Sequence, residues 1–513
     1  MDAAVQEPIG LRLTLSPEAA RKLTRSKGLK PHRRGRGTHE HLTSTYFDTP
    51  HHVLRKAGLA LQLRQDGDRV EQTLKAPVPG PLGLHQQRRW SAPIEGDRPV
   101  LNSIEDANLA RSLRRRRCES RLSSVFTTEV ERTTIRLESN GAKMRLAIDE
   151  GTIRVDNNGH SKAEPICEAE IELLSGDPAG MLDVALEVCE SLDVRLTHQT
   201  KAQRGYALAR PTLRPRSVKA KLPTLTADLT AGESFRVICS SALEHLFRNQ
   251  APVLSGHPGG IHQTRVAMRR IRAALRAFKG LLPYEKRKAF NSEFRAFQQR
   301  LAPARDWHVF LDETLPIILA AEPDQADHIE KLRRVARQER RRATSEAVAA
   351  LKSRRYARLI LRFQKWLADL EREIPKKVFN QPVTPFAKSV LRKTRRELTS
   401  ERRPLTRLPT EDVHTLRKNG KKARYATEFF SSLWDGPRVK PYLKLMAKLQ
   451  DSLGSANDAT VARQILWSLR PGRLEPEVVR LVQDWSDARI KTCITAAHPQ
   501  WRRLRRAKAF WQA

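Results

Sequence analysis

The sequence predicts two domains, an α+β domain followed by an all-helical domain, and three observations support this prediction. The chain has 513 residues, and a single hydrophobic core usually supports fewer than that. Up to about residue 208, short runs alternate between apolar and polar side chains, whereas beyond Glu233 long segments of period 3.6 are rich in Ala, Leu, Arg, Lys and Glu. Between 209 and 227, three prolines lie among Arg, Lys and Thr, as in extended linkers. The predicted domains are residues 1–208 and 228–513.

The first domain combines strand and helix patterns. Every second side chain is apolar at 143–148 and at 166–173, which is typical of strands with one buried face. Helices are predicted at 17–23 and at 178–192, because Ser16 and Asp177 can cap the free amide groups at their starts. The domain is therefore α+β.

Charge and cysteine content limit the class of partner. The chain has 95 Lys and Arg against 57 Asp and Glu, a net charge of +38 that attracts polyanions, whether nucleic acid, polyphosphate or an anionic membrane. Five scattered cysteines without a C-x-x-C pair argue against a disulfide framework and against a zinc site. Since the sequence has no signal pattern and no apolar run of roughly 18 residues, we expect a cytoplasmic protein without a membrane partner.

A basic motif occurs twice in the second domain, 152 residues apart. The first copy reads His-x-x-Arg-x-x-x-Arg-Arg-x-Arg from His262 to Arg272, and the second reads His-x-x-Arg-x-x-x-Lys-Lys-x-Arg from His414 to Arg424. Asp306 and Asp458 follow at the same offset. A match over this many positions predicts a duplicated domain, with copies at about 233–380 and 385–513.

In each copy, helical geometry places most of the basic residues on one face. At about 100° per residue, His262, Arg265 and Arg269 share a narrow arc, opposite a face of Ala, Ile, Leu and Phe. Like charges at these spacings repel by a few tenths of a kcal/mol per pair, so a bound anion would relieve them. The alternative is an ordinary solvated helix face. We expect Asp306 and Asp458 to orient or neutralise the arginines rather than to bind a metal.

The doubled motif and the aspartates resemble the CHAD domain, the conserved histidine α-helical domain, over roughly 230–510. This resemblance implies two four-helix bundles related by a pseudo-twofold axis, with inorganic polyphosphate bound in a central basic channel and no catalysis. The residues that it implies for polyphosphate binding are His262, Arg265, Arg269, Arg270, Arg272, His414, Arg417, Lys421, Lys422, Arg424 and Tyr425.

Several segments of the first domain resemble a CYTH domain, the domain of triphosphate tunnel metalloenzymes. They are 42–50, 54–64, 73–75, 166–172 and 200–206. The resemblance implies an antiparallel tunnel of eight β-strands, in which inward Arg and Lys bind a triphosphate and inward Glu hold Mg²⁺ or Mn²⁺. The cations that it implies for phosphate binding are Arg12, Arg64, Lys75, Arg132, Arg136, Lys201 and Arg204.

The carboxylates of that family pattern are largely missing here. The family opens with Glu-x-Glu-x-Lys, but Pro8, Gly10 and Arg12 occupy the three conserved positions. A later Arg-x-Glu-x-Glu strand has Arg89 and Ser91 in place of its two acids. Only the acidic cluster of 168–172 remains, so Glu168 and Glu170 are candidate metal ligands, although they are better explained as partners of lumen arginines.

The sequence therefore favours a polyphosphate-binding protein, including one associated with polyphosphate granules, whose CYTH-like domain binds phosphate anions but has lost catalysis and requires no cofactor. One alternative is an active inorganic triphosphatase that uses Mg²⁺ or Mn²⁺, with the helical domain holding substrate. The other is nonspecific nucleic-acid binding, against which the low aromatic content of 6% argues.

Overall fold

The computed structural model describes residues 7–67, 69–101, 113, 118–157, 160–210, 215–469 and 475–512, so part of the predicted linker lies outside the described residues. The chain divides into two compact units. The first unit is Met1–Arg216 together with Lys352–Asp369, and the second is Ser217–Leu351 together with Leu370–Ala513. The segment 352–369, which the sequence assigns to the helical domain, thus groups with the first unit.

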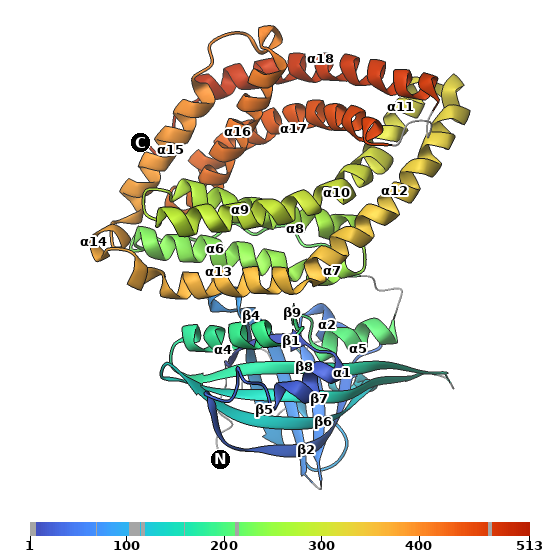
Figure 1. The fold of residues 1–513 in the computed structure, drawn as a ribbon, viewed down its shortest axis with the longest axis vertical. Helices are drawn as coiled ribbons and strands as arrows, with labels where there is room; N and C mark the ends of the chain where they lie inside the picture. Colours follow the sequence, from blue (N-terminus) through green and yellow to red (C-terminus); the bar gives the residue numbers. More distant parts are fainter. Residues whose placement is uncertain are drawn as a thin grey trace. The chain divides into compact units, whose positions relative to one another are not determined.

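The first unit is built around a closed antiparallel sheet (Figure 1). The strand order is β5-β4-β3-β2-β6-β7-β8-β1-β9, and β1 also pairs with β5, which closes the sheet into a barrel. This closure confirms the predicted eight-stranded tunnel. The strands are β1 (Ile9–Thr14), β2 (Arg33–Asp48), β3 (Ala60–Asp66), β4 (Arg69–Pro79), β5 (His85–Pro93), β6 (Ser123–Ser139), β7 (Ala142–Asn157), β8 (His160–Ser175) and the short β9 (Arg195–Thr197).

Strand alternation gives the barrel two different faces. On β8, Glu168 and Glu170 point to the lumen, while Ala169 and Ile171 are fully buried on the outer face. Helices cover the outside and one end of the barrel: α1 (Pro17–Leu23), α2 (Val53–Lys56), α4 (Pro178–Ser191) and α5 (Lys201–Ala209). Ser16 and Asp177 cap α1 and α4 through their side chains, as the sequence predicts.

Helix α13 (Arg354–Glu373) contributes most of its length to the first unit. The buried Gln364 Nε2 donates to the carbonyl oxygen of Leu82 at 3.0 Å, and Lys365 pairs with Asp183 of α4 at 3.3 Å. These contacts explain why the segment groups with the barrel.

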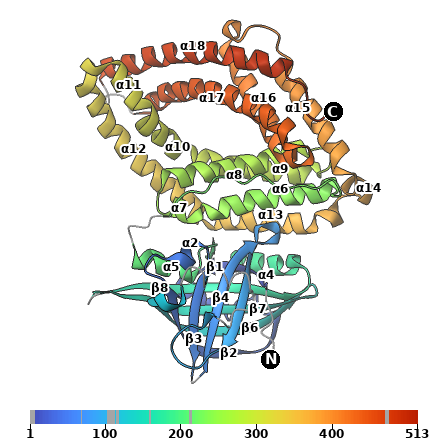
Figure 2. The same ribbon diagram turned by 180° about the vertical axis from the view of Figure 1, so that it is seen from behind.

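The second unit is helical (Figure 1, Figure 2). Its helices are α6 (Ala231–Arg248), α7 (Gln250–Leu254), α8 (Pro258–Ala277), α9 (Tyr284–Arg300), α10 (Ala302–Val309), α11 (Leu315–Ala321), α12 (Ala326–Lys352), α14 (Lys376–Phe379), α15 (Val383–Thr399), α16 (Thr410–Phe430), α17 (Gly436–Trp467) and α18 (Pro476–Arg506). A π-helical turn, Phe310–Thr314, joins α10 to α11. Among the described residues, none of the helices has the length and apolar character that crossing a membrane requires.

The helices repeat at the spacing of the sequence motifs. The starts of α6 and α15, of α8 and α16, and of α9 and α17 are each 152 residues apart. Equivalent residues also meet each other: Thr230 pairs with Pro382 in an isolated antiparallel bridge, and the rings of Phe278 and Phe430 lie 5.7 Å apart. A contact between equivalent residues marks a pseudo-twofold axis, which agrees with the predicted pair of bundles.

Candidate functional site

The basic faces of α8 and α16 contribute four cations to one cluster, because these equivalent helices pack against each other. We call Arg265, Arg269, Arg417 and Lys421 the α8–α16 cluster. Burial, and then the positive charges of Arg417 and Arg269, lower the pKa of Lys421 to about 7. Burial also lowers the pKa values of Arg265 and Arg417, and each of these arginines is further disfavoured by Arg269. The cluster is therefore a region of concentrated, partly desolvated positive charge.

The protein compensates this charge only in part. Arg265 Nη1 lies 3.5 Å from Asp306 Oδ1 and 3.3 Å from the carbonyl oxygen of Ala302. Burial raises the pKa of Asp306 and of Asp458, while Arg265 and Arg417, respectively, oppose that rise. The Nε atoms of Arg265 and Arg417 are nonetheless buried without a hydrogen-bond partner. An anion with several oxygens could satisfy these donors.

Three predicted polyphosphate ligands are instead paired with carboxylates. Arg270, only 3% exposed, donates to Glu428 at 2.8 Å, and Arg424 donates to the other oxygen of Glu428 at the same distance. Lys422 lies 3.5 Å from Glu397. The signal for this arrangement was present in the sequence, since Glu428 occupies the repeat position of Arg276.

Of the remaining predicted ligands, Tyr425 contacts the cluster through Arg269. Arg269 Nε lies 3.3 Å from Tyr425 Oη. Arg272 bonds Asn291 and Gln298, and burial followed by the charge of Arg276 lowers its pKa to about 10. Burial, and then Arg305, lower the pKa of His262 to about 4, while His414 is exposed. The structure thus keeps four of the predicted residues together and holds others in separate hydrogen bonds.

The barrel lumen holds a second set of charges, and its acids are paired with its bases. Asp149 accepts two hydrogen bonds from Arg132, at 2.7 and 2.8 Å, and one from Lys201 at 2.6 Å. Lys201 also lies 2.5 Å from Glu168, and Arg12 lies 2.9 Å from Glu170. These pairs come from the neighbouring strands β6, β7, β8 and β1 and from α5, so they join adjacent parts of the barrel wall.

The lumen charges fix the protonation of the acids. Burial alone would raise the pKa of Asp149, but Lys201 and Arg132 lower it below its usual range. Burial would likewise raise the pKa of Glu170, and Arg12, His85, Lys201 and Lys75 together more than reverse that effect. These carboxylates are therefore ionised and act as counter-charges within the lumen.

The other predicted lumen cations differ in their pairing. Arg204 lies 2.7 Å from Glu164 and 3.4 Å from Glu168. Arg64 faces Glu71 at 4.0 Å, whereas Lys75 donates to the amide oxygen of Gln62 at 3.3 Å. Arg136, the last of the predicted lumen cations, is exposed on the face of β6 that also carries Arg132.

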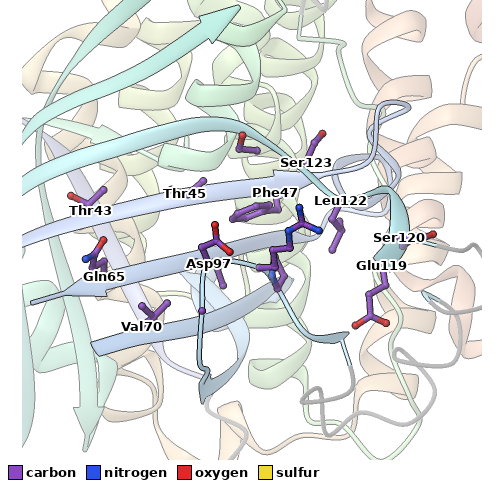
Figure 3. Close-up of a pocket in the computed structure, with 16 residues that line it drawn as sticks. Thr43, Thr45, Phe47, Gln65, Val70, Asp97, Glu119, Ser120, Leu122 and Ser123 are labelled. Atoms are coloured by element: carbon purple, nitrogen blue, oxygen red, sulfur yellow. The ribbon is translucent and has the colours of Figure 1, made fainter. Parts of the chain in front are cut away.

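A hollow of about 1450 Å³ adjoins the barrel, but it lies on the face of β2 and β3 opposite the lumen (Figure 3). Thr43, Thr45, Phe47 and Gln65 line it, and Phe47 belongs to the outer hydrophobic core. Since none of the predicted phosphate ligands lines this hollow, the charged lumen remains the candidate site.

The lumen residues do not fit a divalent metal. Gly10 pairs with Glu172 in the sheet and has no side chain to offer, while Pro8 precedes β1. Glu168 and Glu170 are each held by lumen cations. Within the described part of the chain, no group of three or more His, Cys, Asp or Glu could hold a metal ion. A hard cation needs about six oxygen ligands, and here positive side chains stand among the few acids.

Comparison with known families matches both units. A model of the CYTH domain matches residues 9–206, and a model of the CHAD domain matches residues 237–467. The chain is a CYTH–CHAD protein. Its CYTH domain is the closed barrel, and its CHAD domain is the helical repeat.

Two similar proteins extend this result. The inorganic triphosphatase of Haemophilus influenzae is 30% identical over 168 residues, which are 33% of this chain and 46% of that protein. This chain thus spans about half the length of the curated relative that it matches. The crystal structure of the CHAD domain from the plant Ricinus communis is 27% identical, with a TM-score of 0.50, and the match covers 57% of this chain and 98% of that one. The family matches and the triphosphatase relative associate this protein with phosphate chemistry.

Proposed function

We propose that the CHAD domain binds inorganic polyphosphate at the α8–α16 cluster. The observation that carries this proposal is the meeting of four basic side chains from two equivalent helices, with two buried Nε donors left unpaired. Polyphosphate supplies closely spaced negative charges and oxygens in every direction around its chain, which suits donors on both helices. Asp306 and Asp458 then act as the resident counter-charges that a polyanion displaces or shares.

Polyphosphate fits this cluster better than duplex DNA does. Basic residues three or four positions apart on a helix are about 5–6 Å apart, a spacing that a flexible phosphate chain can follow. Duplex DNA is stiff and presents one charge per ≈ 1.7 Å of its axis. In addition, aromatic residues make up only 6% of the chain, which leaves few stacking platforms for bases.

We propose that the CYTH domain binds phosphate anions in its lumen and does not catalyse their hydrolysis. We also propose that the protein is cytoplasmic, with forms that are bound to polyphosphate granules. Support comes from the cations of the lumen and from the ion pairs that occupy its carboxylates. The second candidate function is metal-dependent hydrolysis of inorganic triphosphate, which the named activity of the Haemophilus relative favours. In that case Mg²⁺ or Mn²⁺ would be the cofactor.

The first prediction concerns charge reversal in the CHAD domain. We expect Arg265→Glu or Arg417→Glu alone to weaken polyphosphate binding about tenfold or more, because each removes a charge-assisted contact. The double variant is expected to lose binding altogether, measured by fluorescence anisotropy with long-chain polyphosphate at about 0.15 M salt. The control is the double variant of two exposed arginines, Arg341→Glu with Arg502→Glu, which changes net charge equally. Equal losses in both double variants would refute the site.

The second prediction concerns pH. A bound polyanion favours protonated Lys421, so the pKa of that ammonium rises from about 7 on binding and affinity should fall as pH increases from 7 to 9. The charged groups acting on Lys421 are Arg417, Arg269, Asp458 and Arg265, and the arginines do not titrate in this range. Lys421→Arg should therefore bind with much weaker pH dependence. An unchanged pH profile in that variant would assign the effect elsewhere.

The third prediction separates the two candidate functions of the CYTH domain. Because Pro8, Gly10, Arg89 and Ser91 replace the family's acids, we expect no phosphate release from triphosphate with Mg²⁺ or Mn²⁺ in the ordinary enzyme range of about 1 to 1,000 per second. A phosphate-release assay on the full chain measures this rate. Turnover within that range would establish the triphosphatase instead.

A further inference from the structure

A cluster of basic groups lies in the barrel where the family pattern would place metal ligands. It consists of Arg12 on β1, Lys75 on β4, and His85 and Arg89 on β5, and we call it the β1–β5 cluster. The strands are neighbours, since Gly10 pairs with His85 and Lys75 pairs with Arg89. Residues two or four apart on β5 share a face, so His85 and Arg89 point to the same side as the lumen residues. None of the family's acids on β1 or β5 remains at this place.

Several donors of this cluster are buried and unpaired. Arg12 is only 6% exposed, and its Nη1 atom makes no hydrogen bond, although Nη2 binds Glu170. The Nε atom of Arg89 and the Nε2 atom of His85 are also buried without a hydrogen-bond partner. Buried polar groups are seldom left unsatisfied, so the two arginine donors, with His85 Nε2 in the tautomer that carries its proton, indicate a ligand that accepts hydrogen bonds.

Positive charge still dominates the cluster when no ligand is bound, although Glu170 pairs with Arg12 and Glu172 lies 3.9 Å from Arg89. Burial, and then the charge of Arg12, lower the pKa of His85 to about 3. Burial, and then the charge of Arg89, lower the pKa of Lys75 well below its usual value. An anion placed among these groups would oppose both shifts, because it stabilises the protonated forms.

The neighbouring acids are already paired with arginines, so they do not make this place suitable for a metal ion. Glu170 is bound by Arg12, and Glu172 lies 2.5 Å from Arg145 and 3.9 Å from Arg89. A divalent cation would have to displace these arginines while remaining close to them. An anion meets the opposite situation, since it adds acceptors to donors that already point into the lumen.

We propose that the β1–β5 cluster binds a phosphate group of a metal-free triphosphate or polyphosphate, taking the place that a divalent metal ion would have in the family pattern. This inference rests on the proposed phosphate binding by the CYTH domain and adds its ligand form, an anion not complexed with metal. Mg²⁺ then acts as a competitor, because it binds the phosphate oxygens that the cluster needs.

The test is a calorimetric titration of the full chain carrying Arg265→Glu and Arg417→Glu, so that the CHAD domain does not contribute. Inorganic triphosphate is added either with EDTA or with Mg²⁺ in excess over triphosphate. We expect binding in EDTA and at least about tenfold weaker binding in Mg²⁺. Binding that requires Mg²⁺ would overturn the inference while leaving phosphate binding by the lumen intact.

Variants of the cluster locate the binding. In the same background and in EDTA, Arg89→Gln and His85→Gln should each weaken triphosphate binding, with a loss of about tenfold for Arg89→Gln, which removes a charged donor. The control is Arg154→Gln, an exposed arginine on the outer face of β7, and thermal unfolding checks that all variants fold. Gly10→Glu should also weaken binding, since its Cβ would lie 3.7 Å from Glu170 Oε1 and bring a second carboxylate.

Two further outcomes are decisive. Unchanged affinity in Arg89→Gln, His85→Gln and Gly10→Glu would show that triphosphate binds elsewhere in the lumen. That outcome would reject the β1–β5 cluster but not the proposed phosphate binding by the CYTH domain. No triphosphate binding in either buffer would reject both the cluster and the proposed phosphate binding by the CYTH domain. Long-chain polyphosphate on the unaltered chain tests the CHAD domain separately.

Discussion

The repulsion between cations held close together and away from water is the constraint on which both domains depend. In the α8–α16 cluster, burial and then this repulsion bring the pKa of Lys421 to about 7, far below that of a free lysine. The duplicated fold produces the crowding, because contact between equivalent helices at a pseudo-twofold axis places each basic face beside its copy. A polyanion relieves the repulsion, so the same crowding that destabilises the free protein favours the binding of an anion.

The CYTH domain meets the same constraint differently. Its lumen acids neutralise Arg12, Arg132 and Lys201 in the free protein, whereas Lys75 on β4 donates to an amide oxygen and Arg89 on β5 lies 3.9 Å from Glu172. Elsewhere in the CHAD domain, Glu428 neutralises Arg270 and Arg424 and keeps them out of the cluster. The candidate sites therefore combine crowded positive charge with several unpaired donors, whereas the structural charges are paired with acids.

Much of this could be predicted from the sequence, because the 152-residue offset and the family motifs gave the duplicated helices and the closed barrel. Helical periodicity fixes the face of a residue but not what packs there, so the pairing of Arg270 with Glu428, 158 residues away, was not foreseen. His85 was missed for a similar reason. Its place beside Gly10 depends on the closure between β1 and β5, which strand alternation alone does not reveal.

The central claim is that geometry at the α8–α16 cluster, rather than net charge, selects polyphosphate. Competition between long-chain polyphosphate and duplex DNA, at equal phosphate concentration and several ionic strengths, tests it most directly. We predict that polyphosphate outcompetes DNA at each ionic strength, remains bound at higher salt, and loses this advantage when Arg269→Ala is combined with Lys421→Ala. Equal competition by DNA, with no loss in that double variant, would contradict the account.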